Sequence, residues 1–197
     1  MLINQKRRLL LSGMGVLPLL LAGCGKEEAL SFHSTDITGA SFGRDFNLTD
    51  PAGRRWALQD FKGKAVMVFF GFTQCPDVCP TALARAVEIK HLLGKDAERF
   101  QVLFITIDPE RDQPEMLGAY TSAFDPDFMG LYGSVEETEA VAREFRIYYK
   151  KVPTGSSYTM DHSAFSYVFD TNAKLRLTVS HSLSAEECAE DIRQLLV

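Results

Sequence analysis

The sequence has no excess of positive charge and few of the residues that bind metals or form disulfides. Its 21 Lys and Arg are outnumbered by 26 Asp and Glu, so the net charge is −5 at pH 7. An acidic chain does not have the broad basic surface that holds nucleic acid, and we expect no nucleic-acid partner. With only four cysteines and four histidines, each candidate ligand can be considered by itself. No internal repeat or low-complexity stretch is visible, and the length predicts one globular domain with its own core.

The N-terminus has the pattern of an export signal. Three basic residues at positions 6–8 precede an apolar run, LLLSGMGVLPLLLAG, which is too short to span a membrane comfortably. The run ends in LAGC at residues 21–24, which resembles the lipobox where bacterial lipoproteins are cut and acylated. The resemblance implies a signal peptide over residues 1–23 and lipid on Cys24. The alternative is an ordinary secretory peptide cut at a small residue, which leaves Cys24 unmodified.

The lipoprotein interpretation divides the mature chain into an anchor and a domain. Removing the three positive charges of the signal peptide changes the net charge from −5 to −8. Residues 24–44 are expected to be the lipid anchor and a flexible tether, because this stretch is polar, has small residues and contains glycine. His33 lies in this segment and is expected to be solvated. Residues 45–197 form the expected domain, held at a membrane and facing the periplasm or the outside of the cytoplasmic membrane.

The domain alternates segments that have strand and helix patterns. Continuous apolar runs at residues 65–72 and 100–108 are typical of buried central strands. Helical spacing and capping pairs predict helices. The predicted elements are a hairpin at 46–58, strands at 65–72, 100–108, 128–133 and 147–152, a loop at 153–157, a hairpin at 163–180, and helices at 81–93, 114–124, 134–145 and 182–197. Their order predicts an α/β fold, with helices on both faces of a central sheet and a parallel first crossover.

Two cysteines four residues apart lie where the first buried strand meets its helix. In GFTQCPDVCP, Cys75 and Cys79 can point the same way if they occupy the loop and the first helical turn. The free amides and the dipole of the helix N-terminus favour a thiolate there. Open α/β sheets place their sites at this edge of the strands. Spacing alone leaves three alternatives open: a structural disulfide, a redox-active pair, or a site for a soft metal.

The histidines differ in whether they can complete such a site. Two thiolates and one imidazole suit copper as Cu(I) or Cu(II), whereas a closed zinc site needs a fourth ligand. His91 lies twelve residues beyond Cys79, about 18 Å along the helix, and cannot reach. His181 is expected to be a capping or surface residue. His162, in TMDHSAF before a strand, is either the third ligand or a satisfied buried histidine. Cys188, in the last predicted helix, is expected to be a small buried apolar residue.

The combined pattern resembles the Sco/SenC family of copper-binding assembly proteins over about residues 40–197. Three stretches carry the resemblance, in family order: GFTQCPDVCPTAL, TIDPERD at 106–112, and MDHSAFSYVFD at 160–170. It implies a thioredoxin-like fold with a central mixed sheet flanked by helices, an N-terminal β-hairpin and inserted elements. It also implies that Cys75, Cys79 and His162 bind copper.

The resemblance implies a role and partners as well. The role is delivery of copper, or of reducing power, to the binuclear copper centre of cytochrome c oxidase. The partners would be the copper-bearing oxidase subunit or another copper client, and a thiol reductant that keeps the redox-active pair of Cys75 and Cys79 open. Asp108, at the end of the second buried strand, could tune the charge of the site or meet a partner. Asp161 could orient His162 by a hydrogen bond.

An enzymatic alternative uses the same cysteines for thiol–disulfide exchange or redox defence. Three features count against a general oxidoreductase. The spacer has three residues rather than two, and His162 stands where thioredoxins place a cis-proline. The peroxiredoxin pattern Pro-x-x-x-Thr-x-x-Cys is absent too, since Thr73 is only two residues before Cys75 and Phe69 stands at the proline position.

Overall fold

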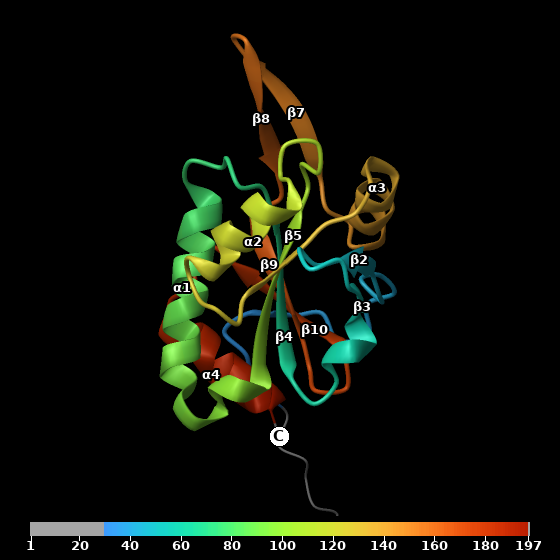
Figure 1. Ribbon diagram of the computed structural model, residues 1–197. Helices are drawn as coiled ribbons and strands as arrows, with labels where there is room; N and C mark the ends of the chain where they lie inside the picture. Colours follow the sequence, from blue (N-terminus) through green and yellow to red (C-terminus); the bar gives the residue numbers. More distant parts are fainter. Residues whose placement is uncertain (1–29, 197) are drawn as a thin grey trace, which may run out of the picture.

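A six-stranded mixed sheet forms the centre of the protein (Figure 1). The structure, a computed structural model, describes residues 30–196. The strands follow the order β1-β10-β9-β4-β5-β6, with β4, β5 and β6 parallel and the other pairs antiparallel. Their bounds are β1 Thr35–Asp36, β4 Ala65–Gly71, β5 Phe100–Thr106, β6 Met129–Leu131, β9 Phe165–Phe169 and β10 Leu175–Ser180. The predicted α/β fold with a central mixed sheet is confirmed.

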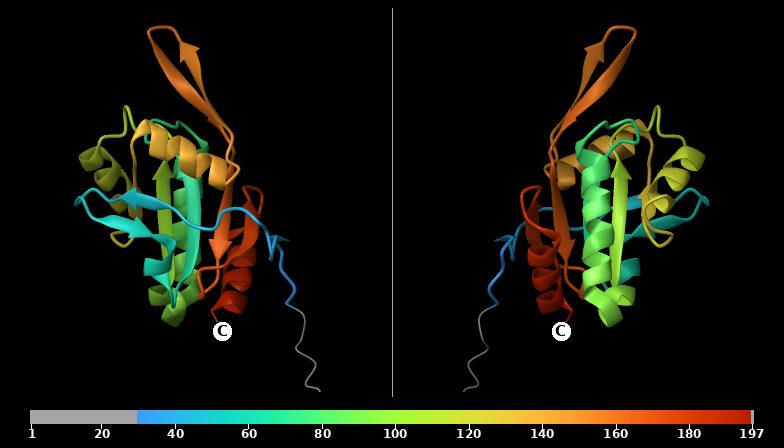
Figure 2. Two further views of the ribbon diagram at one scale, coloured as in Figure 1. Left: turned by 90° about the vertical axis from the view of Figure 1, so that its right-hand side faces the viewer. Right: turned by 90° about the vertical axis from the view of Figure 1, so that its left-hand side faces the viewer.

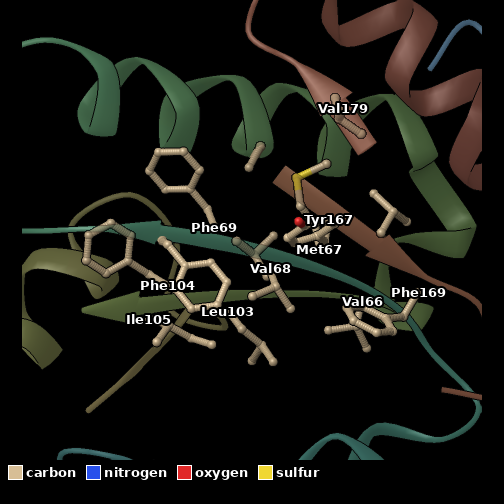
Figure 3. Packing of buried hydrophobic residues seen from close by; sticks show 14 of the residues in the cluster. Val66, Met67, Val68, Phe69, Leu103, Phe104, Ile105, Tyr167, Phe169 and Val179 are labelled. Carbon is tan, nitrogen blue, oxygen red and sulfur yellow. The ribbon is translucent and has the colours of Figure 1, made fainter. Parts of the chain in front are cut away.

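The two predicted central strands are buried along their whole length. Every residue of β4 and β5 is buried, which is why both are continuous apolar runs rather than alternating ones. The strands pair in parallel with Phe69 opposite Phe104, and β9 covers the other edge of β4 (Figure 3). Each buried large apolar side chain stabilises the fold by about 1.5–3 kcal/mol. The carboxyl ends of β4 and β5 are therefore fixed relative to one another.

Helices cover both faces of this sheet, as predicted (Figures 1 and 2). α1 (Val78–Leu93) and α4 (Ala185–Leu195) pack together on one face. α3 (Val135–Glu144) lies on the other, beside the predicted hairpin of β2 (Asn47–Thr49) and β3 (Arg55–Ala57). α2 (Pro114–Ser122) packs against β6, and 3₁₀ turns lie at Leu58–Phe61 and Gly94–Arg99. The serines that precede α3 and α4 form the predicted capping boxes.

A second hairpin projects from the body, and only its first strand was predicted, at residues 147–152. β7 (Tyr149–Thr154) pairs with β8 (Ser157–His162), and Figure 2 shows both extending beyond the sheet. The loop predicted at 153–157 is wrong, because three of its five residues belong to these strands and the other two, Gly155 and Ser156, form the tight turn between them. Gly155 has a positive φ in this turn, at 60°. His162 is therefore the last residue of a strand rather than part of a connecting loop.

The described part of the expected tether is docked on the domain. β1 pairs with β10, and the buried carboxylate of Asp191 on α4 accepts the backbone N–H groups of His33 and Ser34, both at 2.8 Å. His33 is not simply solvated either, since its Nε2 lies 3.0 Å from a carboxylate oxygen of Glu190. The expectation of a flexible tether is therefore wrong for its described part, residues 30–44. The signal peptide and Cys24 lie outside the described residues.

Candidate metal site

The two cysteines are held by the end of β4 and the start of α1. α1 begins at Val78, three residues before the predicted start, so Cys79 lies in its first turn and Cys75 in the preceding loop. The Cys79 side chain is fully buried, and its Sγ packs so closely over Gly71 that a Cβ there would lie 2.7 Å away. The backbone N–H of Cys79 points to Cys75 Sγ at 3.4 Å. The helix N-terminus therefore faces the sulfur of Cys75, as predicted.

His162 reaches this pair from the base of the projecting hairpin. Its Nε2 lies 3.7 Å from Cys79 Sγ, and its ring meets those of Phe69 and Phe72 edge to face. Nδ1 lies 2.9 Å from the carbonyl oxygen of Ser163, which can only accept a hydrogen bond. Nδ1 therefore carries the proton, and the lone pair of Nε2 is free to bind a metal.

The three donor atoms of Cys75, Cys79 and His162 all lie within 4.8 Å of one another. Among residues 30–196 this is the one group of at least three Cys, His, Asp or Glu side chains so arranged. Sulfur and nitrogen ligands bind first-row metals at about 2.0–2.3 Å, so donors around a three-coordinate ion lie about 3.5–4 Å apart. The observed spacing needs little rearrangement to hold an ion. Two thiolates and one imidazole make a soft donor set that suits copper.

The two thiols have very different proton affinities. A hydrogen bond from the Cys79 thiol lowers the pKa of Cys75 to about 3 against the opposing effect of burial. The same hydrogen bond and its deeper burial raise the pKa of Cys79. The pair therefore holds one proton on Cys79 and one negative charge on Cys75 at neutral pH. A bound cation replaces that proton and makes both sulfurs ligands.

Asp108 is not a ligand but ties the hairpin to the domain. Its carboxylate is buried, with 1% of the residue exposed, and it accepts hydrogen bonds from Arg111 Nε and, at 2.8 Å, from the hydroxyl of Tyr158 on β8. Arg111 also donates to the Tyr158 carbonyl oxygen at 2.7 Å and stacks on its ring at 3.7 Å. Lys151 on β7 adds an ion pair with Glu110. These contacts fix the hairpin that carries His162.

The expected role of Asp161 is not supported by its position. Adjacent strand residues point to opposite faces, and Asp161 is exposed while His162 turns inward. The hydrogen bond that orients His162 is made with the Ser163 carbonyl oxygen, not with Asp161. The expectation that Asp161 fixes the imidazole by a hydrogen bond is therefore wrong.

Asp112 lies beside the site and was not singled out from the sequence. Its buried carboxylate accepts hydrogen bonds from the backbone N–H and the hydroxyl of Thr73, and from the hydroxyl of Thr106. Burial raises its pKa, which hydrogen bonds from both threonines oppose. The one sequence feature that pointed to Asp112 was its place at the end of TIDPERD, four residues after Asp108.

The remaining candidates lie away from the donor atoms. His91 lies exposed on α1 and is not part of the donor group, as expected, and His33 is on the N-terminal segment. His181 is half-buried, with its ring 6.5 Å from that of Phe69, but it does not belong to the donor group. Cys188 is buried on α4, which confirms the structural expectation, and burial raises its pKa to about 11.

The fold and this donor group define a thioredoxin-like protein with a soft-metal site at the strand–helix junction. The chain matches the SCO1/SenC family over residues 34–197 and belongs to it. The SCO2-like protein of Rickettsia felis is 37% identical over 169 residues, which cover 84% of this chain and 82% of that protein.

Solved structures of the family agree with this chain in fold, and one of them holds copper. ScoI from Bradyrhizobium japonicum with copper bound is 41% identical, with a TM-score of 0.73 over 80% of this chain and 100% of that one. Apo Sco1 from Thermus thermophilus is 37% identical, with a TM-score of 0.76 over 84% of this chain and 98% of that one. The family and the thioredoxin-like fold expected from the three motifs are thus confirmed, and the side chains of Cys75, Cys79 and His162 lie together.

Proposed function

We propose that Cys75, Cys79 and His162 bind one copper ion per chain, and that the protein delivers it during assembly of cytochrome c oxidase. The observation that carries this proposal is the convergence of two sulfurs and one imidazole nitrogen within 4.8 Å. A copper-bound relative that is 41% identical supports the choice of metal. Two thiolates favour Cu(I) and the imidazole also serves Cu(II), so the site suits both oxidation states. The client in this proposal is the copper-bearing oxidase subunit or a protein with a similar copper centre.

The surroundings of the three ligands suit a site that releases its metal. Cys79 is fully buried, but Cys75 is half-buried in a loop and His162 is half-buried at the base of the projecting hairpin. The proposed site has three ligands from residues 30–196, so a ligand from a client can approach the ion before any bond to this chain breaks. The metal then passes between proteins without being free in solution.

The redox state of the cysteines is expected to control loading. Oxidation removes two electrons and the one proton that the pair holds, and joins Cys75 to Cys79. A disulfide sulfur is a poor copper ligand. An exported protein meets an oxidising compartment, so a thiol reductant must supply two electrons before copper can bind. Reduced protein should bind one copper per chain, and oxidised protein should bind it weakly until reductant is added. Equal affinity in both states would rule out the cysteine pair as ligands.

Delivery itself is tested with a client. The Cu(I)-loaded chain is mixed with the copper-free soluble domain of an oxidase copper subunit, and the copper on each protein is measured after separation. We expect copper to appear on the client, and no transfer from a Cys79→Ser variant because it fails to load. A wild-type chain that loads copper but keeps it in the presence of excess client would contradict delivery.

Thiol–disulfide exchange is the second candidate function, and the thiolate of Cys75 favours it. In that reaction the Cys75 thiolate attacks a client disulfide and releases one client thiolate. Cys79, once its proton has moved to that leaving sulfur, then attacks Cys75 and releases the second client sulfur as a thiolate, which takes a proton from water. The product is a Cys75–Cys79 disulfide and a reduced client. A Cys79→Ser variant should accumulate the mixed disulfide with an oxidised client, and its absence would exclude this function.

We also propose that lipid on Cys24 anchors the domain to the outer side of a membrane. The lipobox-like LAGC sequence supports this proposal. Among residues 30–196, no helix is both long and apolar enough to cross a membrane. A Cys24→Ser variant should accumulate uncleaved or appear in the soluble fraction. Normal amounts of mature protein in the membrane fraction would contradict lipid anchoring.

A further inference from the structure

The three donor residues are not held equally firmly. Cys79 is fixed by α1 and by its packing over Gly71, and His162 by the hairpin contacts of Asp108 and Arg111. Cys75 lies in the loop between β4 and α1, where neighbouring side chains such as Gln74 and Pro76 are exposed. The position of its sulfur therefore depends on what holds this loop.

The loop has few hydrogen bonds of its own. The Cys75 N–H donates to the Phe72 carbonyl oxygen at 3.2 Å, and Asp77, at the N-cap of α1, makes no side-chain capping bond. Gln74 has only a long contact with Arg111, at 3.3 Å. The short bonds between this loop and another element are made by Thr73, whose hydroxyl donates to Asp112 Oδ1 at 2.6 Å and whose N–H donates to Oδ2 at 3.0 Å.

Asp112 is in turn held in place by the end of β5 and by the turn that follows it. Its Oδ2 accepts the hydroxyl of Thr106, the last residue of β5, at 2.6 Å. Its backbone N–H donates to the Asp108 carbonyl oxygen at 3.0 Å, which closes a tight turn. Only 1% of Asp112 is exposed, so water cannot replace these partners. A buried carboxylate is costly unless it is hydrogen-bonded, and three donors offset that cost.

We propose that Asp112 is the positioning residue for Cys75, acting through Thr73. Its carboxylate joins the carboxyl end of β5 to the loop that leaves β4, two residues before Cys75. This bridge holds Cys75 Sγ within bonding range of an ion that also touches Cys79 and His162. Asp112 itself is a partner of the loop and not a ligand. The inference rests on the proposed copper function only for the readouts that use bound copper.

The test compares variants that cut the bridge at Thr73 or at Asp112. Thr73→Val keeps the shape of the side chain but loses the hydroxyl, and Thr73→Ser keeps the hydroxyl. Asp112→Asn keeps the shape of the carboxylate but loses its charge and one acceptor. Outer partners of metal ligands typically contribute 10- to 100-fold to metal affinity. We expect Thr73→Val and Asp112→Asn each to weaken copper binding about tenfold, with a changed visible spectrum of the Cu(II) form, and Thr73→Ser to stay within about twofold of wild type.

A double variant tests whether the two residues act as one unit. If Asp112 acts through Thr73, Thr73→Val combined with Asp112→Asn should be about as weak as the worse single variant, because coupled changes are not additive. Thr106→Val, which loosens Asp112 from β5, should lower the melting temperature but change the spectrum less than Thr73→Val. A purely structural role would lower the melting temperature in all variants and leave the spectrum unchanged.

A readout without copper separates this inference from the proposed function. In the reduced, metal-free full-length chain, the alkylation rate of Cys75 by iodoacetamide reports how its thiolate is placed. We expect Thr73→Val and Asp112→Asn to change this rate several-fold in the same direction, with Thr73→Ser close to wild type. Unchanged rates in both variants, or effects on copper affinity that simply multiply, would overturn the inference. Failure of the wild-type chain to bind copper would remove the proposed function but leave this comparison standing.

Discussion

The Sγ of Cys79 lies 3.7 Å from Nε2 of His162, although 83 residues separate them in the chain. One comes from the first turn of α1 and the other from the end of β8, so neither element alone can form the site. The parallel pair β4 and β5 lies beneath the site and fixes the start of the loop that carries Cys75. The contacts among Asp108, Arg111 and Tyr158 fix the position of the hairpin that carries His162. Mutations that disturb the geometry of the site can therefore be distinguished from mutations that destabilise the whole fold.

The difference in proton affinity between the thiols predicts their reactivity. Because the pKa of Cys75 is lowered to about 3, its thiolate is present at pH 6 and throughout the neutral range. Cys79 keeps its proton, and Cys188 is buried with its pKa raised to about 11. Iodoacetamide at pH 6 should therefore label Cys75 of the reduced, metal-free protein well before any other described cysteine. Peptide mass mapping measures this, and a Cys75→Ser variant should lose the fast phase. Fast labelling of Cys79 instead would contradict the assignment.

Gly71 tests whether the close packing of the Cys79 sulfur matters. A Cβ at this position would lie 2.7 Å from Cys79 Sγ and 2.8 Å from Phe104 Cε2, so Gly71→Ala must displace both. We expect a stability loss of about 1–3 kcal/mol, typical of overpacking, together with weakened copper binding.

Gly130→Ala is the matched control for this change. A Cβ there would lie 2.6 Å from Leu117 Cγ, a clash of similar severity on β6 that does not involve a sulfur. We expect a similar loss of stability in denaturant unfolding but unchanged copper affinity at a temperature where the protein is folded. If both variants lost copper affinity equally, the effect would be general destabilisation.

Asp191 tests the docking of the N-terminal segment. Its fully buried carboxylate accepts the N–H groups of His33 and Ser34, so Asp191→Ala leaves both donors without their partner. We expect a loss of about 2 kcal/mol or local release of the segment, seen as faster hydrogen exchange in the peptide covering residues 30–37. Glu190→Ala removes only an exposed partner of His33 and should have a much smaller effect than Asp191→Ala. Unchanged exchange in Asp191→Ala would mean that β1 alone holds the segment.

The sequence allowed prediction of those parts that have a local cause. β4 and β5 are continuous apolar runs because they are buried on both faces, and the serine–glutamate pairs start α3 and α4 by local hydrogen bonds. The three candidate ligands were predicted from the family motifs, since all three lie in recognisable short stretches.

The parts that were missed depend on distant partners. The residues of β8 are mostly polar and show no strand pattern of their own, and Tyr158 is fixed by Asp108, 50 residues earlier. Asp191 holds Ser34 from 157 residues away, so nothing near residue 34 marks the segment as docked. No local pattern distinguishes the buried Asp112 from a solvated aspartate after a strand. The role proposed for Asp112 depends on the pairing of β4 with β5, which brings Thr73 and Thr106 to the same carboxylate.

X-ray absorption of the copper-loaded chain tests the central claim most directly, because it counts the atoms bound to the metal. The measurement is made on the reduced protein with one equivalent of Cu(I), for wild type, His162→Ala and Cys188→Ala. We expect two sulfur neighbours and one imidazole nitrogen in wild type and Cys188→Ala, and loss of the imidazole signal in His162→Ala. A wild-type spectrum with fewer than two sulfurs, or one that His162→Ala leaves unchanged, would contradict the Cys75–Cys79–His162 site.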